Sequence, residues 1–274
     1  MATAMVLPKL YSNSNNLTVL TTSVILKKSQ HLIEWKDKPS ILEFGFADGT
    51  NSQKSLHPLL PADYNEFIGV DISKPMVEYA KKHVVMSRSE FVQLDIATKN
   101  LPKQFQNRFD HVFSFYTLKM NVARQAFKNV YTMLKPQGET FQVFFKVLPV
   151  EDAFDALAKH PKWGKYGHEM MVTTVPNSNP SEVFEDAVKE AGFKNISFKE
   201  EDITYKFANE QAWKDLYYSV NPVVANIPPN EIEEYKVDYF SQIRKHTLKQ
   251  TEDCKDQEAK VEFTLCVVSA KKHS

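Results

Sequence analysis

The sequence predicts an α/β protein with a seven-stranded, mostly parallel sheet, helices on both faces and a mainly helical lid. Three observations predict it. An apolar segment leads into a glycine-containing turn at residues 40–49. Short apolar segments then alternate with helical ones as far as residue 268, and two aromatic-rich segments, 149–180 and 205–255, fall outside this alternation. A parallel sheet covered by helices buries such an alternation, and we interpret residues 1–274 as a single domain.

The first expected strand, Ser40–Phe44, runs directly into a turn that holds Gly45 and Gly49. A buried parallel strand has this apolar pattern, and glycine lets the backbone turn tightly and approach a ligand. We expect a helix just beyond, capped by Asn51 or Ser52, with free N–H groups at the same edge of the sheet. An ordinary strand–turn–helix has the same pattern, so the turn alone indicates no ligand.

Composition excludes several classes of protein. Thirty-four basic residues balance thirty-four acidic ones, which argues against nucleic acid or an anionic membrane as a partner. Cys254 and Cys266 are too few for a disulfide framework and lack the spacing of metal ligands. No apolar run approaches the ~20 residues of a membrane span, and residues 1–10 lack the apolar core of a signal peptide. We therefore expect a cytoplasmic protein without a metal, as a monomer or weak homodimer.

The N-terminal segment, residues 10–36, is expected to form a helical cap over the sheet. Its apolar residues recur at roughly helical intervals, at Leu17, Leu20, Val24, Leu32 and Trp35. One or two helices would place these side chains on a common face.

The remaining elements follow in order. Strands are expected at residues 40–44, 67–70, 90–94, 109–115, 140–145, 195–199 and 261–268. Helical segments are expected after Gly49, broken by Pro58 and Pro61, then from Ser73, at 122–134 and at 183–191, with a turn at 135–138.

Two strands end on an acidic residue. Asp71 lies about 20 residues past the glycine turn, where a nucleotide-type ribose is held through its hydroxyls. Ser73 and Pro75 also mark a helix start, so Asp71 has a second interpretation as part of a helix cap. After the third strand, Asp95 can accept from an adenine amino group while Ile96 covers the ring.

The two segments outside the alternation are expected to begin where strands end, at the edge where open α/β sheets bind ligands. Residues 149–180 contain Trp163 and Tyr166, and residues 205–255 are aromatic and mainly helical. We interpret both as lid insertions. The alternative is that they only thicken the domain.

In this series of motifs the chain resembles class I S-adenosylmethionine (SAM) methyltransferases, which have a Rossmann-like sheet. A closer resemblance, over nearly the whole chain, is to arthropod juvenile hormone acid O-methyltransferases. Its residues are at 10–15, 69–80 and 109–118, with the pairs Lys162–Trp163 and Asn221–Pro222. The run Ser114–Leu118 is the most particular of these.

The resemblance implies a cofactor, S-adenosyl-L-methionine, and an acceptor, a sesquiterpenoid carboxylic acid. It also implies roles for individual residues. The cofactor would contact Gly45, Asp48 and Gly49 at its methionine end, Asp71 at the ribose, Asp95 and Ile96 at the adenine, and Ser114 beside the sulfonium. Ile72, next to Asp71, would also contact it. The acceptor would contact Tyr11, Tyr116, Met120, Trp163 and Tyr166.

This chemistry needs no general base. A carboxylic acid with a pKa of about 4.3 is already ionised at neutral pH. The protein has to align the carboxylate oxygen, the methyl carbon and sulfur, an orientation effect of ~7–11 kcal/mol in favourable cases. We therefore interpret His83, His111 and His168 as structural or surface residues.

The sequence departs from the family at the acyl group. Thr18 stands at the position of a glutamine, and Lys119–Met120 at that of a His-Trp pair. Thr18 retains a hydroxyl, whereas Met120 has no N–H donor. Lys119 can pair with a carboxylate as a point charge or point to solvent. We treat Thr18 and Lys119 as the candidate catalytic residues. Ala47 replaces the middle glycine of the turn and would be strained at positive φ.

Three hypotheses follow. The chain methylates the carboxylate of a small apolar acid, sesquiterpenoid or fatty, that differs from the family's own. Alternatively, it methylates a hydroxyl or amine, which would require a base that the sequence does not nominate. The third hypothesis is a catalytically weakened paralogue that binds SAM or a terpenoid.

Overall fold

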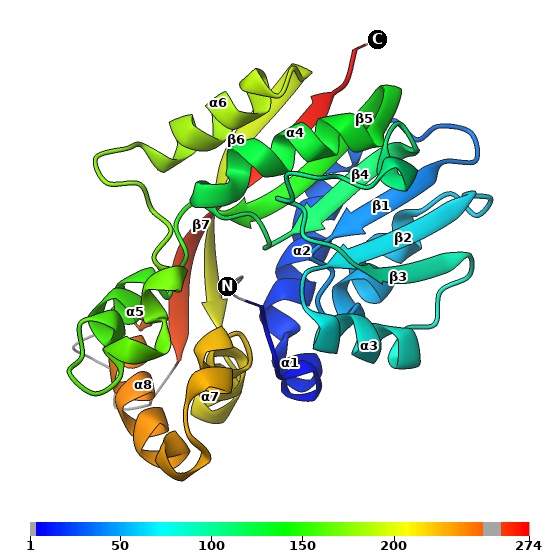
Figure 1. The fold of residues 1–274 in the computed structure, drawn as a ribbon. Coiled ribbons are helices and arrows are strands. Elements are labelled where there is room, and N and C mark those ends of the chain that lie inside the picture. Colours follow the sequence, from blue (N-terminus) through cyan, green and yellow to red (C-terminus); the bar gives the residue numbers. More distant parts are fainter. Residues whose placement is uncertain (1–3, 249–258, 274) are drawn as a thin grey trace.

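The computed structural model describes residues 4–248 and 259–273, and within them a mixed sheet forms the centre of the molecule (Figure 1). The sheet has seven strands in the order β3-β2-β1-β4-β5-β7-β6, and β7 is antiparallel to both of its neighbours. The strands are β1 (Ser40–Phe44), β2 (Glu66–Asp71), β3 (Ser89–Gln93), β4 (Phe109–Phe115), β5 (Leu134–Phe145), β6 (Lys194–Lys206) and β7 (Lys260–Lys271). The predicted seven-stranded, mostly parallel α/β sheet is confirmed.

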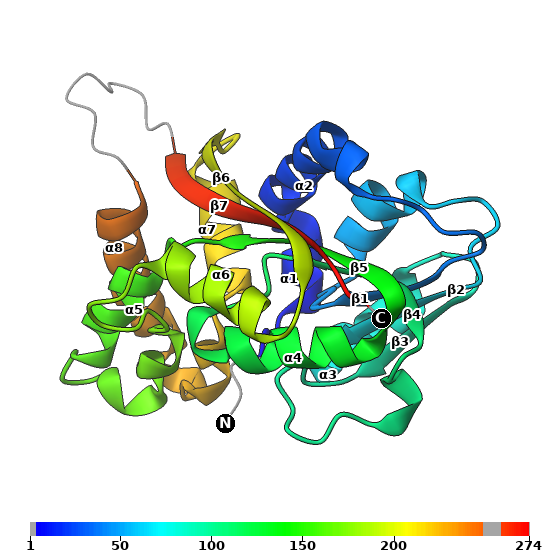
Figure 2. The same ribbon diagram turned by 90° about the horizontal axis from the view of Figure 1, so that it is seen from above.

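Helices cover both faces of this sheet (Figure 2). On one face, Leu42 and Val112 belong to a buried cluster with α4 (Ala123–Met133) and α6 (Pro180–Glu190). On the other, Ile41 and Phe113 pack with α2 (Asn16–Ser29) and α3 (Lys74–His83). Every residue of β1 is buried, as expected for a central parallel strand with both faces covered.

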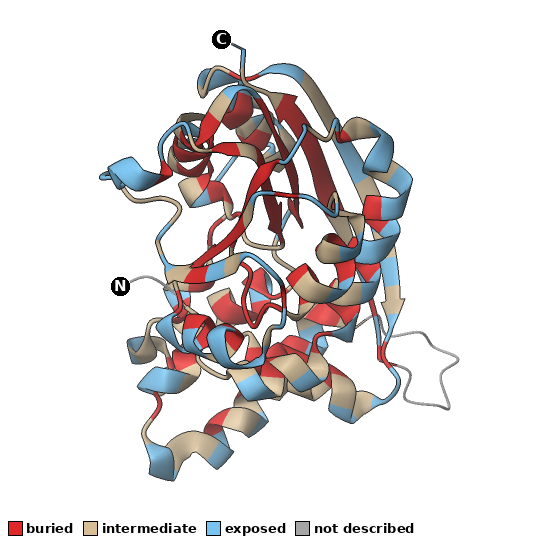
Figure 3. Ribbon diagram, turned by 90° about the vertical axis from the view of Figure 1, so that its right-hand side faces the viewer, coloured by how far each residue is buried: buried red, intermediate tan, exposed pale blue. Residues whose placement is uncertain are grey.

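A third group of helices lies beyond the carboxyl ends of the parallel strands (Figure 1). It contains α1 (Pro8–Ser14), α5 (Glu151–Ala158), α7 (Glu210–Ser219) and α8 (Ile232–Thr247). These helices share a buried aromatic cluster that includes Trp163, Trp213, Tyr235 and Tyr239. Figure 3 shows buried residues both in the sheet and in this layer. Aromatic packing of this kind contributes strongly to a core.

Short helical turns connect these elements. They are the π-helical turn Ser52–Leu56 and the 3-10 turns Gln30–Leu32, His57–Leu59, Lys103–Phe105, Met120–Val122, Gly164–Tyr166, His168–Met171, Pro222–Asn226 and Pro229–Glu231. The predicted lid segments 149–180 and 205–255 correspond to the layer of α5, α7 and α8, with residues 249–255 outside the described part. That this layer moves as a lid stays a prediction, and so does the role of residues 10–36 as a cap. None of the described helices has the length and apolarity needed to cross a membrane.

Two local predictions were wrong. Residues 135–138, predicted as a turn, lie inside β5 because Gln137 N–H donates to Lys272 O (3.0 Å) and prolongs the pairing with β7. The register between β4 and β5 shifts there. Asn51 and Ser52 do not cap a helix: both are buried, and Asn51 already has helical backbone angles.

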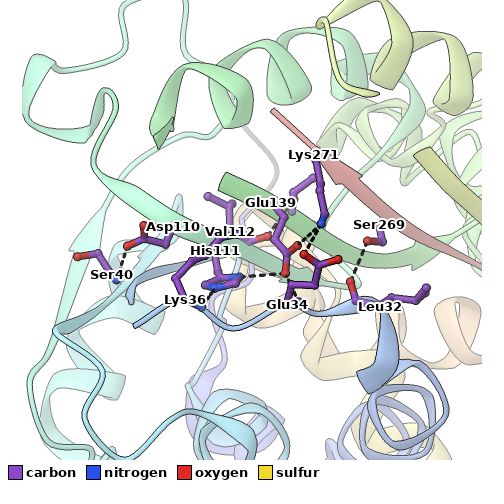
Figure 4. A network of polar contacts seen from close by, with 11 residues as sticks. Leu32, Glu34, Lys36, Ser40, Asp110, His111, Val112, Glu139, Ser269 and Lys271 are labelled. Carbon is purple, nitrogen blue, oxygen red and sulfur yellow. Dashed lines mark hydrogen bonds and ion pairs between the residues drawn. The ribbon is translucent and has the colours of Figure 1, made fainter. Parts of the chain in front are cut away.

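His111 lies at the edge of the sheet opposite to the third group of helices, in a polar network (Figure 4). Its Nδ1 is 3.3 Å from Glu139 Oε1, and its Nε2 accepts from the Lys36 N–H (3.4 Å). Glu139 also accepts from the Glu34 N–H (2.7 Å), and Lys271 lies 3.9 Å away. The network joins the segment before β1 to β4, β5 and β7, as expected of a structural histidine.

Candidate active site

The loop after β1 has three residues with positive φ: Gly45 (69°), Ala47 (54°) and Gly49 (82°). A Cβ at Gly45 would stand 1.9 Å from Oγ1 of Thr117, so this position requires glycine. Ala47 adopts the left-handed conformation that the sequence identified as strained. The loop therefore has a fixed path over the end of β1.

Asp71, at the end of β2, holds that loop through hydrogen bonds. Its Oδ2 accepts from the Ala47 N–H (2.9 Å), and its Oδ1 accepts from the Ser73 N–H (2.8 Å). Ser73 in turn caps α3, because its Oγ accepts from the Met76 N–H (3.3 Å). Burial raises the pKa of the Asp71 carboxyl, while both backbone bonds oppose that shift. Asp71 thus connects the loop to the start of α3.

One cavity, of about 350 Å³, lies along the ends of β1, β2 and β3. It is lined by Phe44, Gly45, Asp71, Ile72, Leu94, Asp95, Ile96, Ala97, Thr117, Lys119, Asn121, Val122 and Met170. Asp95 Oδ1 accepts from the Ala97 N–H (2.8 Å), which orients this carboxylate. Carboxylates at successive strand ends beside aliphatic side chains suit a nucleoside, because its hydroxyl and amino groups donate and its ring needs an apolar cover.

A second cavity, of about 220 Å³, lies between the sheet and the third group of helices and is mostly apolar. Its aliphatic and aromatic lining includes Leu17, Phe115, Phe145, Leu148, Val150, Met171, Leu216, Val220 and Phe263. Three of its hydroxyls contact protein atoms: Tyr11 contacts Thr18 (3.4 Å), Tyr116 contacts Thr21, and Thr117 donates to Gly45 O (3.1 Å). This cavity suits a hydrocarbon chain.

The two cavities meet. Five residues line both: Gly45, Asp71, Ile72, Thr117 and Lys119. Lys119 is the basic residue in this common wall, and its Nζ lies 3.5 Å from Met171 Sδ. Burial lowers the pKa of its amine, and the negative charge of Glu151 acts in the opposite direction. Lys119 is therefore accessible from both cavities.

Nine of the residues predicted for the site line one or both cavities. These are Tyr11, Thr18, Gly45, Asp71, Ile72, Asp95, Ile96, Tyr116 and Lys119. The positions of these residues fit the contacts predicted for them with cofactor and acceptor, and those contacts stay predictions.

Three residues predicted to contact the cofactor do not line either cavity. Asp48 is buried and accepts from the Asn15 Nδ2 (3.3 Å) and from Thr50. Ser114 is buried and donates to Phe44 O (2.9 Å). Gly49 forms the turn itself, through its N–H bond to Phe46 O (3.0 Å). Asp48 and Gly49 thus form contacts within and around the loop, and Ser114 bonds to the last residue of β1.

Three residues predicted to contact the acceptor also lie elsewhere. The Met120 sulfur accepts from the Val175 N–H (3.2 Å) in a buried cluster with α4. Trp163 Nε1 donates to Asp238 (2.6 Å), and Tyr166 donates to Glu231 (3.0 Å). These bonds direct the two aromatic side chains toward α8 and the turn before it. Sequence reasoning instead missed four lining residues. Thr117 belongs to the particular run Ser114–Leu118 but was given no role, and Phe145, Leu216 and Phe263 showed only as members of apolar or aromatic segments.

Glu43, on β1, is buried beneath the loop, and its Oε2 has no hydrogen-bond partner among the described residues. Burial raises the pKa of its carboxyl to about 8, and the charges of Asp71 and Asp48 act in the same direction.

Glu43→Gln is expected to remove a pH dependence of stability. Because the folded pKa lies above the ordinary value, the contribution of Glu43 is full below the ordinary pKa and is lost as pH rises through about 8. Urea unfolding at pH 6 and pH 9 should show the wild type losing stability relative to the variant at pH 9. A difference independent of pH would refute this assignment.

Comparisons with known proteins agree with this geometry. A family model described as a methyltransferase domain matches residues 41–138. The juvenile hormone acid O-methyltransferase of Bombyx mori is 30% identical over 244 residues, which cover 87% of this chain and 86% of that protein. That of Drosophila melanogaster is 28% identical over 273 residues, covering 96% and 91%.

Solved structures share the fold. A putative methyltransferase from Bacillus halodurans superimposes with a TM-score of 0.56 at 16% identity, covering 91% of this chain and 99% of that one. A Haemonchus contortus phosphoethanolamine N-methyltransferase 2, solved with S-adenosyl-L-methionine, gives 0.55 at 15% identity, covering 97% and 57%. At this identity the likeness concerns the fold alone.

Proposed function

The chain belongs to the juvenile hormone acid O-methyltransferase family, and on this premise we propose that it methylates the carboxylate of a small apolar acid of the sesquiterpenoid or fatty class. It is a SAM-dependent methyltransferase. The observation that carries the substrate proposal is Lys119, a basic group in the wall common to a nucleoside-type cavity and an apolar one.

SAM supplies an electrophilic methyl group when bound. In this proposal Asp71 accepts from the ribose hydroxyls, Asp95 accepts from the adenine, and Ile96 covers its ring. The pre-oriented carboxylates support these roles, because each oxygen that accepts a backbone N–H fixes the direction of the group. Gly45, the loop residue that lines this cavity, would lie next to the methionine end of the cofactor.

The acceptor enters the second cavity with its carboxylate at Lys119. An ion pair there orients one oxygen while the apolar walls exclude water, so that the other oxygen attacks without losing a proton. Pairing with a cation weakens the nucleophile, and desolvation and alignment have to outweigh that loss. In this proposal Thr18 on α2 and Tyr116 in the loop after β4, which both line this cavity, contact the acyl group.

A hydroxyl group in the acid's tail is expected to lower kcat/KM by about 10- to 100-fold, because a buried hydroxyl without a partner costs about 1–3 kcal/mol. The tail cavity is mostly apolar, and the hydroxyls of Tyr11, Tyr116 and Thr117 already contact protein atoms. Competition between a saturated fatty acid and its mid-chain hydroxy derivative measures the ratio. Equal rates would contradict the expected tail selectivity.

The function itself is tested with methyl-labelled SAM and a panel of acids, alcohols and amines of matched chain length. We expect label in esters of apolar acids, with the alcohols and amines unreacted. Label in an alcohol or amine would contradict carboxylate specificity. Calorimetry with SAM, run in parallel, identifies a protein that binds the cofactor without turning over any acid, which would support the weakened paralogue.

A further inference from the structure

Glu151 is buried at the start of α5, immediately behind the wall of the apolar cavity. Its Oε1 accepts from the N–H groups of Thr173 (3.0 Å) and Thr174 (2.6 Å), and its Oε2 accepts from the Thr173 hydroxyl (3.2 Å). Three donors directed at one carboxyl group are the partners of an ionised, acceptor-only carboxylate. Glu151 therefore places a fixed negative charge beneath the cavity.

The same contacts connect Glu151 to Lys119. Met171, whose sulfur lies 3.5 Å from the Lys119 Nζ, is two residues before the Thr173 that Glu151 holds. Leu148 and Val150, on the chain leading into Glu151, line the cavity beside Lys119. Burial in this apolar wall lowers the pKa of the Lys119 amine, and the charge of Glu151 raises it.

Other titratable groups also lie around the two cavities, but among the described residues Glu151 is the one whose charge acts on the Lys119 amine. Asp71 after β2 is held by two backbone N–H groups, and Asp95 lies after β3. The tyrosines are Tyr11 on α1, Tyr116 after β4 and Tyr217 on α7. Burial raises the pKa of Tyr116 to about 12 and raises those of Tyr11 and Tyr217 as well, so these phenols stay neutral in the working range. Glu151 is the acid whose charge opposes the desolvation of Lys119.

We propose that Glu151 is a positioning residue that keeps Lys119 cationic and directed at the acceptor's carboxylate, an inference that rests on the proposed function. It acts through Lys119 and through the segment 171–174 and does not touch the acceptor. It thereby makes recognition of an anion possible in a cavity whose apolar wall favours the neutral amine. The acceptor class that follows is a monoanionic acid.

The experiment compares three variants by the pH dependence of kcat/KM for an apolar acid. Glu151→Gln removes the charge, yet its amide oxygen can still accept both backbone N–H bonds. Thr173→Val removes the hydroxyl bond and retains the charge. Asp152→Asn removes a charge from the next, exposed residue of α5 and is the matched control.

In the wild type, kcat/KM falls as pH rises through the pKa of Lys119, because the cation is lost. Without the charge of Glu151 that pKa falls further, so the alkaline limb should move to lower pH by about 0.5–1 unit. Thr173→Val and Asp152→Asn should leave the limb in place. The affinity for the acid, measured by calorimetry with S-adenosylhomocysteine present, should fall as pH rises. In Glu151→Gln this fall should begin at a lower pH than in the wild type.

Several outcomes would overturn the proposal. One is an unchanged alkaline limb in a folded Glu151→Gln, and another is an equal shift in Asp152→Asn. A rate that increases as Lys119 loses its proton would make Lys119 a base and refute its role as a cation. If Glu151→Gln does not fold, Lys119→Arg still tests the requirement for a cation. A guanidinium stays charged at alkaline pH, so this variant should show no alkaline fall in kcat/KM. An alkaline fall retained in Lys119→Arg would overturn the proposal. A wild type that methylates no acid would instead refute the proposed function.

Discussion

Replacing Lys119 with methionine is expected to lower kcat/KM for an apolar acid by about 10²–10³-fold, because truncating one partner of a buried, hydrogen-bonded charge pair costs about 2–5 kcal/mol. Methionine is similar in length to the lysine stem, so the cavity should keep its shape. The loss should be largest in KM if Lys119 holds the acid equally in the ground and transition states. Steady-state kinetics with a labelled methyl group measures both constants.

The matched control for this change is Lys128→Met, which removes an exposed lysine of α4, a helix that packs against one face of the sheet. It should leave both constants within about twofold, as surface substitutions usually have small effects. The affinity for SAM, measured by calorimetry, should change far less in Lys119→Met than the activity does. A Lys119→Met enzyme with undiminished kcat/KM would remove Lys119 from carboxylate recognition.

Gly45→Ala is expected to weaken SAM binding by at least about 10²-fold, by analogy with the loss of catalytic rate that a displacement of about 1 Å causes. The new Cβ would meet the Thr117 side chain, at 1.9 Å from Oγ1, and φ is +69°. The loop, Thr117 or both have to move, and both line the common wall of the two cavities. Strain at positive φ adds about 1–2 kcal/mol of destabilisation.

Gly192→Ala separates these two effects. Gly192 also has positive φ (+100°), but a Cβ there would be no closer than 3.4 Å to Tyr131, outside both cavities. Both variants should lose stability in urea, while Gly192→Ala should bind SAM as the wild type does. SAM binding at wild-type affinity by a folded Gly45→Ala would contradict the location of the cofactor.

Local sequence patterns predicted the elements that do not depend on distant contacts. β4 was predicted at its observed limits, 109–115, from a short segment rich in Phe and Val. The placement of Asp71 and Asp95 near one cavity followed from parallel topology, which brings successive strand ends to one edge. By contrast, β5, β6 and β7 are longer than predicted. β7 pairs in antiparallel fashion with both β5 and β6, and this pairing continues into polar residues that the apolar pattern did not include.

The acceptor side of the site was harder to predict because it is assembled from segments without periodicity. Lys119 and Met120 are adjacent, yet the 3-10 turn Met120–Val122 directs Met120 into the core while Lys119 lines the cavities. Aromatic character alone did not reveal that Trp163 and Tyr166 bond to α8 and the turn before it. Glu151 had no sequence signal, since its partners lie 22 and 23 residues away.

The common wall of the two cavities is the central claim, and a crystal structure of the ternary complex with S-adenosylhomocysteine and a fatty acid tests it most directly. We expect the ribose at Asp71, the hydrocarbon tail among Phe145, Leu216 and Phe263, and the acid's carboxylate within hydrogen-bonding distance of the Lys119 Nζ. An acid bound with its carboxylate away from Lys119, or a nucleoside outside the cavity at Asp71 and Asp95, would contradict the account.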